Sequence, residues 1–178
     1  DERYEQAIRA GFKDIAQQLV EFPFGDGIDV ILGGGRRGFV PAGLPGAKGK
    51  GLSKGRRIDG RNLVEEWGYE DNREYVSTRG ELLALDSAKS GQLMGLFAWN
   101  HLKYEVVASS VESDRKEPSL REMGVLAVDR LRTNSKGFFL MVEGGRIDHG
   151  HHFSSAKRAL TETIEFDRTV KAIYERLS

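Results

Sequence analysis

The segment that decides the fold class is IDVILGGG, residues 28–35. It is a short apolar run that stops at three glycines, which is typical of a buried strand ending in a loop. A similar run, GFFLMV, occupies residues 137–142 and predicts a second buried strand over 138–142. Residues 93–97 form another apolar run, and residues 104–108 suit a further short strand. Helical patterns alternate with these runs, so we predict an α/β fold, part of a largely parallel sheet flanked by helices.

The helices are predicted from apolar residues at helical spacing and from capping residues. They cover residues 3–20, 62–67, 79–85 and 119–132, and a last helix begins at Ser154 or Ser155. In that last helix, one face is expected to point inward: Ala156, Leu160, Ile164, Val170, Ile173, Tyr174 and Leu177. The glycine-rich stretch 36–60 reads as a long surface loop. No stretch resembles a linker between two cores, so we expect one domain or part of one.

Composition excludes several classes of function. The 178 residues include 27 basic and 27 acidic side chains, so net charge does not favour nucleic acid as a partner. The chain has no cysteine, which rules out thiolate catalysis, cysteine zinc sites and disulfides. No apolar run approaches the roughly 20 residues that span a bilayer. No signal peptide opens the sequence, although a processed chain would also lack one.

Candidate metal ligands cluster in EGGRIDHGHH, residues 143–152, directly after the predicted strand 138–142. Ligands bind at the carboxyl ends of strands in open α/β sheets, so a site is expected here. Asp148 and His152 are four residues apart, and one helical turn would place both on the same side. Glu143 lies at the strand end, within reach of a neighbouring ion. Imidazole and carboxylate groups bind zinc, and carboxylates suit magnesium. The alternative is a set of solvated loop histidines, and two ligands alone do not complete a zinc site.

The sequence VEGGRIDHGHH over residues 142–152 resembles the metal-binding signature of alkaline phosphatases. Other blocks resemble the same family in the same order, namely DVILGGGR at 29–36, NLVEEW at 62–67, LMGLF at 93–97, GFFL at 137–140 and ALTETI at 159–164. The resemblance therefore covers nearly the whole chain. It implies a hydrolase that removes phosphate from monoesters through a phosphoserine intermediate.

The resemblance also implies roles for individual residues. Glu143 matches a magnesium ligand, and Asp148 and His152 match two ligands of the first zinc ion. His149 matches a residue that lies near the phosphate without coordinating the first zinc, whereas no role carries over to His151. A complete site is expected to hold two Zn²⁺ ions and Mg²⁺.

The nucleophilic serine is expected to lie outside this chain. Asp86-Ser87-Ala88 resembles the triplet that carries it, but Ser87 follows the glycine-rich strand, whereas the family nucleophile precedes it. We therefore predict that residues 1–178 are an internal segment of a single alkaline-phosphatase-like catalytic domain, incomplete at both ends and inactive alone. Its partners would be the missing N- and C-terminal parts of the same protein.

The resemblance further implies phosphate monoester substrates, a homodimer and a periplasmic, secreted or cell-surface location. Two alternatives remain open. One is a related metal-dependent phosphodiesterase or sulfatase-like hydrolase, and the other is a non-catalytic module that binds a metal for structural reasons.

Several other motifs are better explained by structure than by function. Gly33, Gly35 and Gly38 match a dinucleotide-binding pattern, but no helix is predicted to follow them directly, so a strand-end turn is favoured. The basic residues of the loop are read as solvated, namely Lys48, Lys50, Lys54, Arg56, Arg57 and Arg61.

Three further predictions concern charged residues. Glu66, Glu117 and the Phe97 carbonyl resemble parts of a family calcium site, but Ala98 stands where the family has glutamate, so no calcium is expected. Asp167 is expected near the buried face of the last helix, with a structural partner. Arg146 is expected either to hold a carboxylate in a buried ion pair or to serve catalysis.

Overall fold

A computed structural model describes residues 2–43, 55–87, 89–110 and 115–178. These residues form two compact units. The first comprises Asp1–Ser77 and Gly91–His101, and the second comprises Thr78–Ser90 and Leu102–Ser178. The part of the loop that carries Lys48, Lys50 and Lys54 lies outside the described residues.

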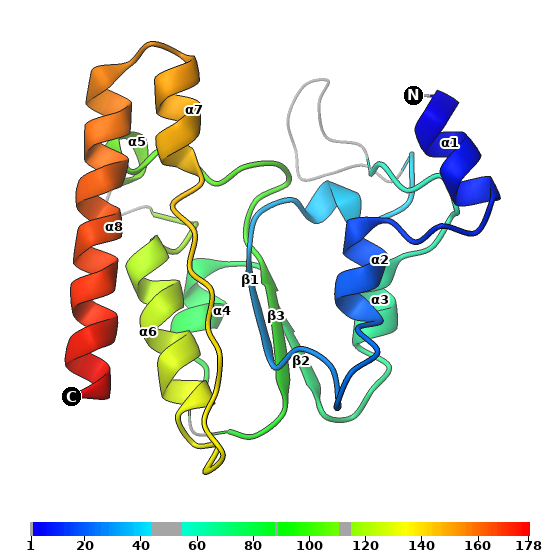
Figure 1. Ribbon diagram of the computed structural model, residues 1–178, viewed down its shortest axis with the longest axis horizontal. Coiled ribbons are helices and arrows are strands. Elements are labelled where there is room, and N and C mark those ends of the chain that lie inside the picture. Colours follow the sequence, from blue (N-terminus) through cyan, green and yellow to red (C-terminus); the bar gives the residue numbers. More distant parts are fainter. Residues whose placement is uncertain (1, 44–54, 88, 111–114) are drawn as a thin grey trace. The chain divides into compact units, whose positions relative to one another are not determined.

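The first unit contains the sheet (Figure 1). In chain order its elements are α1 (Glu2–Arg9), α2 (Ile15–Val20), β1 (Val30–Gly33), the 3₁₀ turn η1 (Arg36–Gly38), α3 (Leu63–Trp67), β2 (Arg73–Val76) and β3 (Gln92–Leu96). All strand pairs are parallel, and the strand order is β1-β3-β2, with Ile31 opposite Met94 and Tyr75 opposite Met94. The predicted α/β class with a parallel sheet flanked by helices is confirmed.

The core of this unit forms around the central strand, β3. Leu93 and Met94 are fully buried, as expected for a strand paired on both sides. Leu63 and Trp67 of α3 are also buried, and the Trp67 indole N–H donates a hydrogen bond of 2.9 Å to the Glu74 carbonyl of β2. Helix α3 is thereby fixed to the edge of the sheet.

The predicted single helix over residues 3–20 is wrong, because the chain forms two helices there. Gly11 has a φ of +83°, a left-handed conformation that ends a helix. Asp14 then caps α2, accepting a 2.9 Å hydrogen bond from the Gln17 N–H. The glycine turn at Gly11 and the cap at Asp14 therefore divide the segment into two helices, although its apolar residues keep helical spacing throughout.

The second unit is helical (Figure 1). Its elements are α4 (Arg79–Leu83), α5 (Glu105–Ala108), α6 (Leu120–Leu131), α7 (Arg146–His152) and α8 (Ala156–Leu177). Thr78 and Ser119 start α4 and α6 with capping boxes, and both helices lie where the sequence predicts them. Helices α5, α6 and α7 all pack against α8.

Two predicted strands are absent from this unit. Residues 104–108 contain α5 instead, and residues 138–142 form no strand. Phe139 is 89% exposed and Met141 is 73% exposed, so the apolar run is not buried in the described structure. A strand requires a neighbour for its N–H and C=O groups, and no described segment pairs with this run.

The predicted inward face of the last helix is wrong for most of its residues, although Ile173 is half-buried and lies against Gly124 of α6. Leu160 is 63% exposed and Tyr174 is 72% exposed, whereas α8 buries Ala159, Glu165 and Thr169. Side chains elsewhere on that apolar stripe, Ile164, Val170 and Leu177, are exposed as well, and so is Asp167, contrary to its predicted position near the buried face. Two of the buried residues of α8 lie against glycines, Ala159 against Gly150 of α7 and Thr169 against Gly124 of α6.

Candidate metal centre

Helix α7 carries the candidate ligands, and its two ends explain how it is placed. Gly145 precedes its first residue, Arg146, and provides no side-chain cap, and the Ile147 N–H donates a 3.0 Å hydrogen bond to the Gly144 carbonyl. After the helix, Ser154 adopts a φ of +50°, and the Ser155 N–H donates to the Gly150 carbonyl at 3.0 Å. This tight turn folds α8 back along α7, as the orange and red ribbons of Figure 1 show.

Gly150 sets the distance between these two helices. A methyl group added at Gly150 would lie 2.7 Å from the backbone nitrogen of Ala159 and 2.9 Å from its Cα. Only glycine permits so close an approach without movement of the α8 backbone. Gly150 therefore faces α8, whereas the side chains of Asp148 and His152 are exposed.

Asp148 and His152 lie side by side on the solvent side of α7. The Oδ2 atom of Asp148 is 3.3 Å from Nε2 of His152, and the two side chains are 71% and 75% exposed. The four-residue spacing therefore brings the two groups together, as the sequence analysis expected. Their role as zinc ligands stays a prediction.

Glu143 lies outside this pair. It is exposed, it precedes α7, and its carboxylate lies near Gly145. Within the described ranges, no group of three or more histidine and acidic residues is arranged to hold a metal ion. The structure thus brings Asp148 and His152 together, and the role of Glu143 as a magnesium ligand stays a prediction.

His149 contacts Arg146 one turn earlier in α7. A nitrogen of the Arg146 guanidinium, Nη1, is 3.2 Å from Nδ1 of His149. The Cζ atom of Arg146 lies 3.7 Å from the ring centroid of Tyr104, which is 7% exposed. Arg146 thus makes a cation–π contact and a contact with a histidine, and its charge opposes the rise in the pKa of Glu162. Its role in an ion pair or in catalysis stays a prediction.

A network of buried carboxylates lies between α5 and α8 in the same unit. Arg115 donates two hydrogen bonds of 2.8 Å to Glu105, and the Glu105 N–H donates to Glu162. Burial raises the pKa of Glu162, against the lowering effect of that hydrogen bond. Burial also raises the pKa of Glu165, and the nearby Glu105 carboxylate adds to this increase. The sequence analysis missed this network, because carboxylates 57 and 60 positions away in the chain meet only in the folded unit.

Ser87 lies in a turn after α4, half-buried. It belongs to the Asp-Ser-Ala triplet, whose third residue, Ala88, lies outside the described residues. Its exclusion as the nucleophile stays a prediction.

The glycine pattern at residues 33–38 and the basic loop both have structural explanations. Only the three-residue turn η1 follows Gly35, whose φ is +79°, so no long helix opens behind the glycines. The predicted solvation of the basic loop is wrong for Arg57, which is 1% exposed and hydrogen bonds to Asp14 and Asp59. A strand-end turn and a buried ion-pair network therefore account for these residues.

The two acidic residues that resemble a calcium site have other partners. Glu66 accepts a 3.0 Å hydrogen bond from Nε of Arg61, and Glu117 accepts a 2.7 Å hydrogen bond from the Lys103 N–H. The Arg61 guanidinium thus supplies the positive charge beside Glu66.

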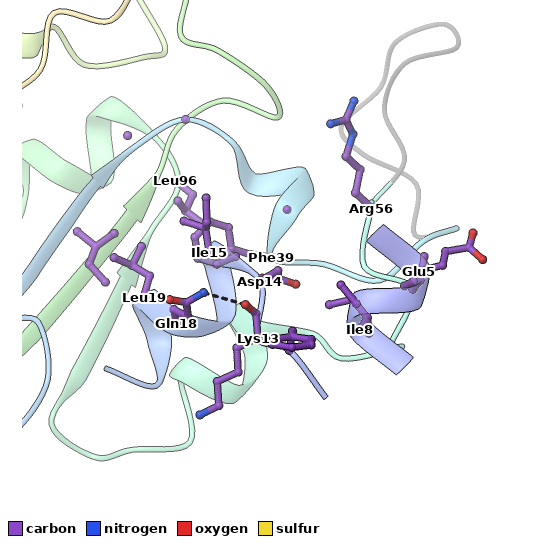
Figure 2. Close-up of a pocket in the computed structure, with 18 of the residues that line it drawn as sticks. Glu5, Ile8, Lys13, Asp14, Ile15, Gln18, Leu19, Phe39, Arg56 and Leu96 are labelled. Carbon is purple, nitrogen blue, oxygen red and sulfur yellow. Dashed lines mark hydrogen bonds between the residues drawn. The ribbon is translucent and has the colours of Figure 1, made fainter. Parts of the chain in front are cut away.

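A cavity of about 1130 Å³ occurs in the first unit, and it does not involve the candidate ligands. Figure 2 shows its wall, where apolar side chains of α1, α2 and the end of the sheet meet, such as Ile8, Ile15, Leu19 and Leu96. Its lining also includes charged groups, among them Lys13 and Arg56.

No helix in the described ranges has the length and apolar character needed to cross a membrane.

Comparison with known proteins identifies the family. A family model described as alkaline phosphatase matches residues 1–178. The chain is 45% identical over 170 residues to a membrane-bound alkaline phosphatase of Bombyx mori, covering 92% of this chain and 30% of that protein. It is 33% identical to the solved structure of Thermus thermophilus alkaline phosphatase, with a TM-score of 0.70, covering 88% of this chain and 28% of that one.

A further likeness concerns the fold alone. A structure of a TAB5 alkaline phosphatase variant, reported with Mg bound, shares 19% identity and a TM-score of 0.62, covering 90% of this chain and 39% of that one. The chain spans about 30% of the length of the curated relatives it matches. On the match over residues 1–178 and the identity to these relatives, the chain belongs to the alkaline phosphatase family.

Proposed function

We propose that this chain forms part of a metal-dependent phosphomonoesterase, to which it contributes half of the first zinc site. The observation that carries the proposal is the Asp148–His152 pair on the exposed side of α7. Family membership supports the reaction, the removal of phosphate from monoesters. The phosphoserine step would use a serine outside this chain.

The distance between the two side chains fits a shared zinc ion. Zinc binds carboxylate oxygen and imidazole nitrogen at about 2.0–2.2 Å in tetrahedral geometry, so two ligand atoms of one ion lie about 3.3–3.5 Å apart. The Oδ2–Nε2 distance of 3.3 Å lies at the lower end of this range. The high exposure of both groups leaves the remaining coordination positions open to ligands from elsewhere in the protein.

A zinc ion held here would polarise a phosphate oxygen and lower the pKa of a bound water to about 7. Asp148 and His152 would fix its position through α7, which Gly150 holds tightly against α8. Glu143 would hold magnesium through its exposed carboxylate, and carboxylate oxygen is the ligand that magnesium prefers. A second zinc ion would require residues that this chain does not supply.

Family membership also supports a homodimer and a location outside the cytoplasm, at the cell surface, in the periplasm or secreted. The Bombyx mori relative is named membrane-bound, which favours a cell-surface or secreted place for this protein too.

The test is His152→Ala in the complete protein that carries this sequence. We expect zinc content to fall by one ion per chain and turnover of a phosphate monoester to fall by orders of magnitude. The matched control is His151→Ala, which removes an exposed imidazole one position away from the pair. Ser87→Ala is a second control and should leave turnover within about twofold. Unchanged zinc and turnover in the His152 variant would contradict the proposal.

A further inference from the structure

The strand β1 has the composition of an internal strand, although it lies at one edge of the described sheet. Its sequence over residues 30–33, VILG, contains no charged residue and no proline. The strand order β1-β3-β2 leaves one side of β1 without a described neighbour. The strand at the opposite edge, β2, carries Arg73 and Glu74. Charged residues and prolines protect natural sheet edges from further pairing, so β2 has the composition of an edge strand and β1 does not.

Alternate residues of β1 direct their backbone groups to this free side. The Leu93 N–H of β3 donates a 2.8 Å hydrogen bond to the Asp29 carbonyl, and β1 pairs with β3 in the parallel sense. Backbone groups alternate in direction along a strand, so Ile31 also faces β3, whereas Val30 and Leu32 face away from it. Among the described residues, no segment pairs with Val30 and Leu32 on that side. A further strand would satisfy their N–H and C=O groups.

The cavity of about 1130 Å³ lies against the same strand (Figure 2). Ile31 and Leu32 both line it, and consecutive side chains of a strand point to opposite faces, so the cavity is not confined to one face of β1. Phe12 and Ile15 also belong to its lining, and they are 69% and 83% exposed. Large apolar side chains therefore remain uncovered beside β1, which is typical of a surface that binds a partner.

The size and the charges of the cavity favour an apolar polypeptide segment over a small ligand. Its volume exceeds the roughly 300–1,000 Å³ of a typical small-molecule pocket. Two of its charged lining residues already have partners, because Lys13 pairs with Glu21 at 2.8 Å and Asp14 pairs with Arg57 at 2.8 Å. An apolar strand that pairs with β1 would place alternate side chains into such a cavity.

We propose that the free edge of β1 and the adjoining cavity form a docking surface for an apolar strand from the part of the same protein outside residues 1–178. The proposal rests on the proposed function, which makes this chain part of a larger protein. The chain spans about 30% of the length of the curated relatives it matches, and proteins of that length have further polypeptide to supply the strand. The added strand would accept the hydrogen bonds of Val30 and Leu32 and cover Ile15.

The first test measures amide hydrogen exchange in the complete protein that carries this sequence, resolved to single residues by fragmentation in a mass spectrometer. The Ile31 N–H faces β3 and serves as the matched control. We expect the Val30 and Leu32 amides to exchange within about tenfold of the Ile31 rate, because all three would be hydrogen bonded inside a sheet. Exchange of Val30 and Leu32 that is more than about tenfold faster than that of Ile31 would overturn the inference.

The second test identifies the segment that covers the cavity. In the complete protein, Ile15 is replaced by the photoreactive residue p-benzoylphenylalanine, and the crosslinked peptides are mapped by mass spectrometry. We expect a crosslink within one polypeptide, to an apolar segment outside residues 1–178. Tyr69 is the matched control position, since it is 77% exposed and does not line the cavity. A crosslink between two copies of the protein, a crosslink confined to residues 1–178, or no crosslink from position 15 would each refute the assigned occupant.

The outcomes separate this inference from the proposed function, because neither exchange nor crosslinking depends on zinc or on turnover. If His152→Ala changes neither zinc content nor turnover, the proposed function fails, yet slow exchange at Val30 and Leu32 still supports the docking surface. Rapid exchange at these two amides, in a protein whose His152→Ala variant loses zinc and turnover, would overturn the docking surface alone.

Discussion

Replacing Gly150 with alanine should destabilise the second unit, although alanine is the better helix former. The structure places the new methyl group 2.7 Å and 2.9 Å from backbone atoms of Ala159, so the backbone of α7 or α8 must shift. Overpacking of a close-packed contact costs about 1–3 kcal/mol, and a clash with backbone belongs at the upper end. The higher helix propensity of alanine adds about 1 kcal/mol to the free energy of unfolding. The net loss in the free energy of unfolding is about 2 kcal/mol.

Gly80→Ala is the matched control, because it makes the same change in a helix of the same unit. A methyl group at Gly80 meets nothing within 4 Å, so only the propensity term remains. This variant should gain up to about 1 kcal/mol. The two substitutions therefore have opposite signs, and the difference between them, about 3 kcal/mol, isolates the contact between α7 and α8.

Thermal unfolding followed by far-UV circular dichroism measures both variants, since the second unit contains the longest helices. A loss of about 2 kcal/mol lowers Tm by about 4–8 °C in a chain of this size. Both tryptophans, Trp67 and Trp99, lie in the first unit, so their fluorescence serves as an internal reference. A Gly150→Ala variant that is as stable as Gly80→Ala would refute the close approach of the two helices.

Three further predictions follow from buried charges and from the incomplete site. Burial raises the pKa of Glu165, so its contribution to stability is present below the ordinary value of 4.5 and is lost as pH rises through the raised value. Urea titrations should show the wild type losing stability relative to Glu165→Gln over that rise in pH, and parallel pH profiles would contradict this. Arg57→Leu should lower the free energy of unfolding by about 3 kcal/mol, because Asp14 and Asp59 lose the guanidinium between them. Tryptophan fluorescence measures this loss, and a change below about 1 kcal/mol would refute it. The 178-residue chain alone should not hydrolyse a chromogenic phosphate ester, since it supplies two ligands where a catalytic zinc uses three; sustained, chelator-sensitive turnover would disprove the incomplete site.

Local patterns predict those elements whose environment is set nearby in the chain. The apolar runs at 28–32 and 93–97 become β1 and β3, since a buried parallel strand needs apolar residues on both faces. The capping box at Ser119 starts α6 where the sequence places it. The pairing of Asp148 with His152 follows from helical geometry alone, because residues four apart lie on one side of a helix.

Other predictions fail because they depend on distant partners. The run 138–142 has the composition of a strand, but a strand forms only where another segment accepts its hydrogen bonds. Residues 104–108 form a helix although they are partly β-branched, since α5 packs on α8 and Glu105 binds Glu162 there. Short segments have weak intrinsic preferences, and tertiary contacts decide between the alternatives.

The sequence by itself indicated the α/β fold class, the pairing of Asp148 with His152 and the resemblance to alkaline phosphatases, because these follow from local apolar runs, helical spacing and short motifs. Only the tertiary structure decided which face of α8 is buried, where Gly150 brings α7 onto Ala159, and that Arg146 lies over the ring of Tyr104. These features join residues more than 40 positions apart in the case of Tyr104 and Arg146. Their side chains interact only after packing removes them from water, and no local pattern encodes that packing.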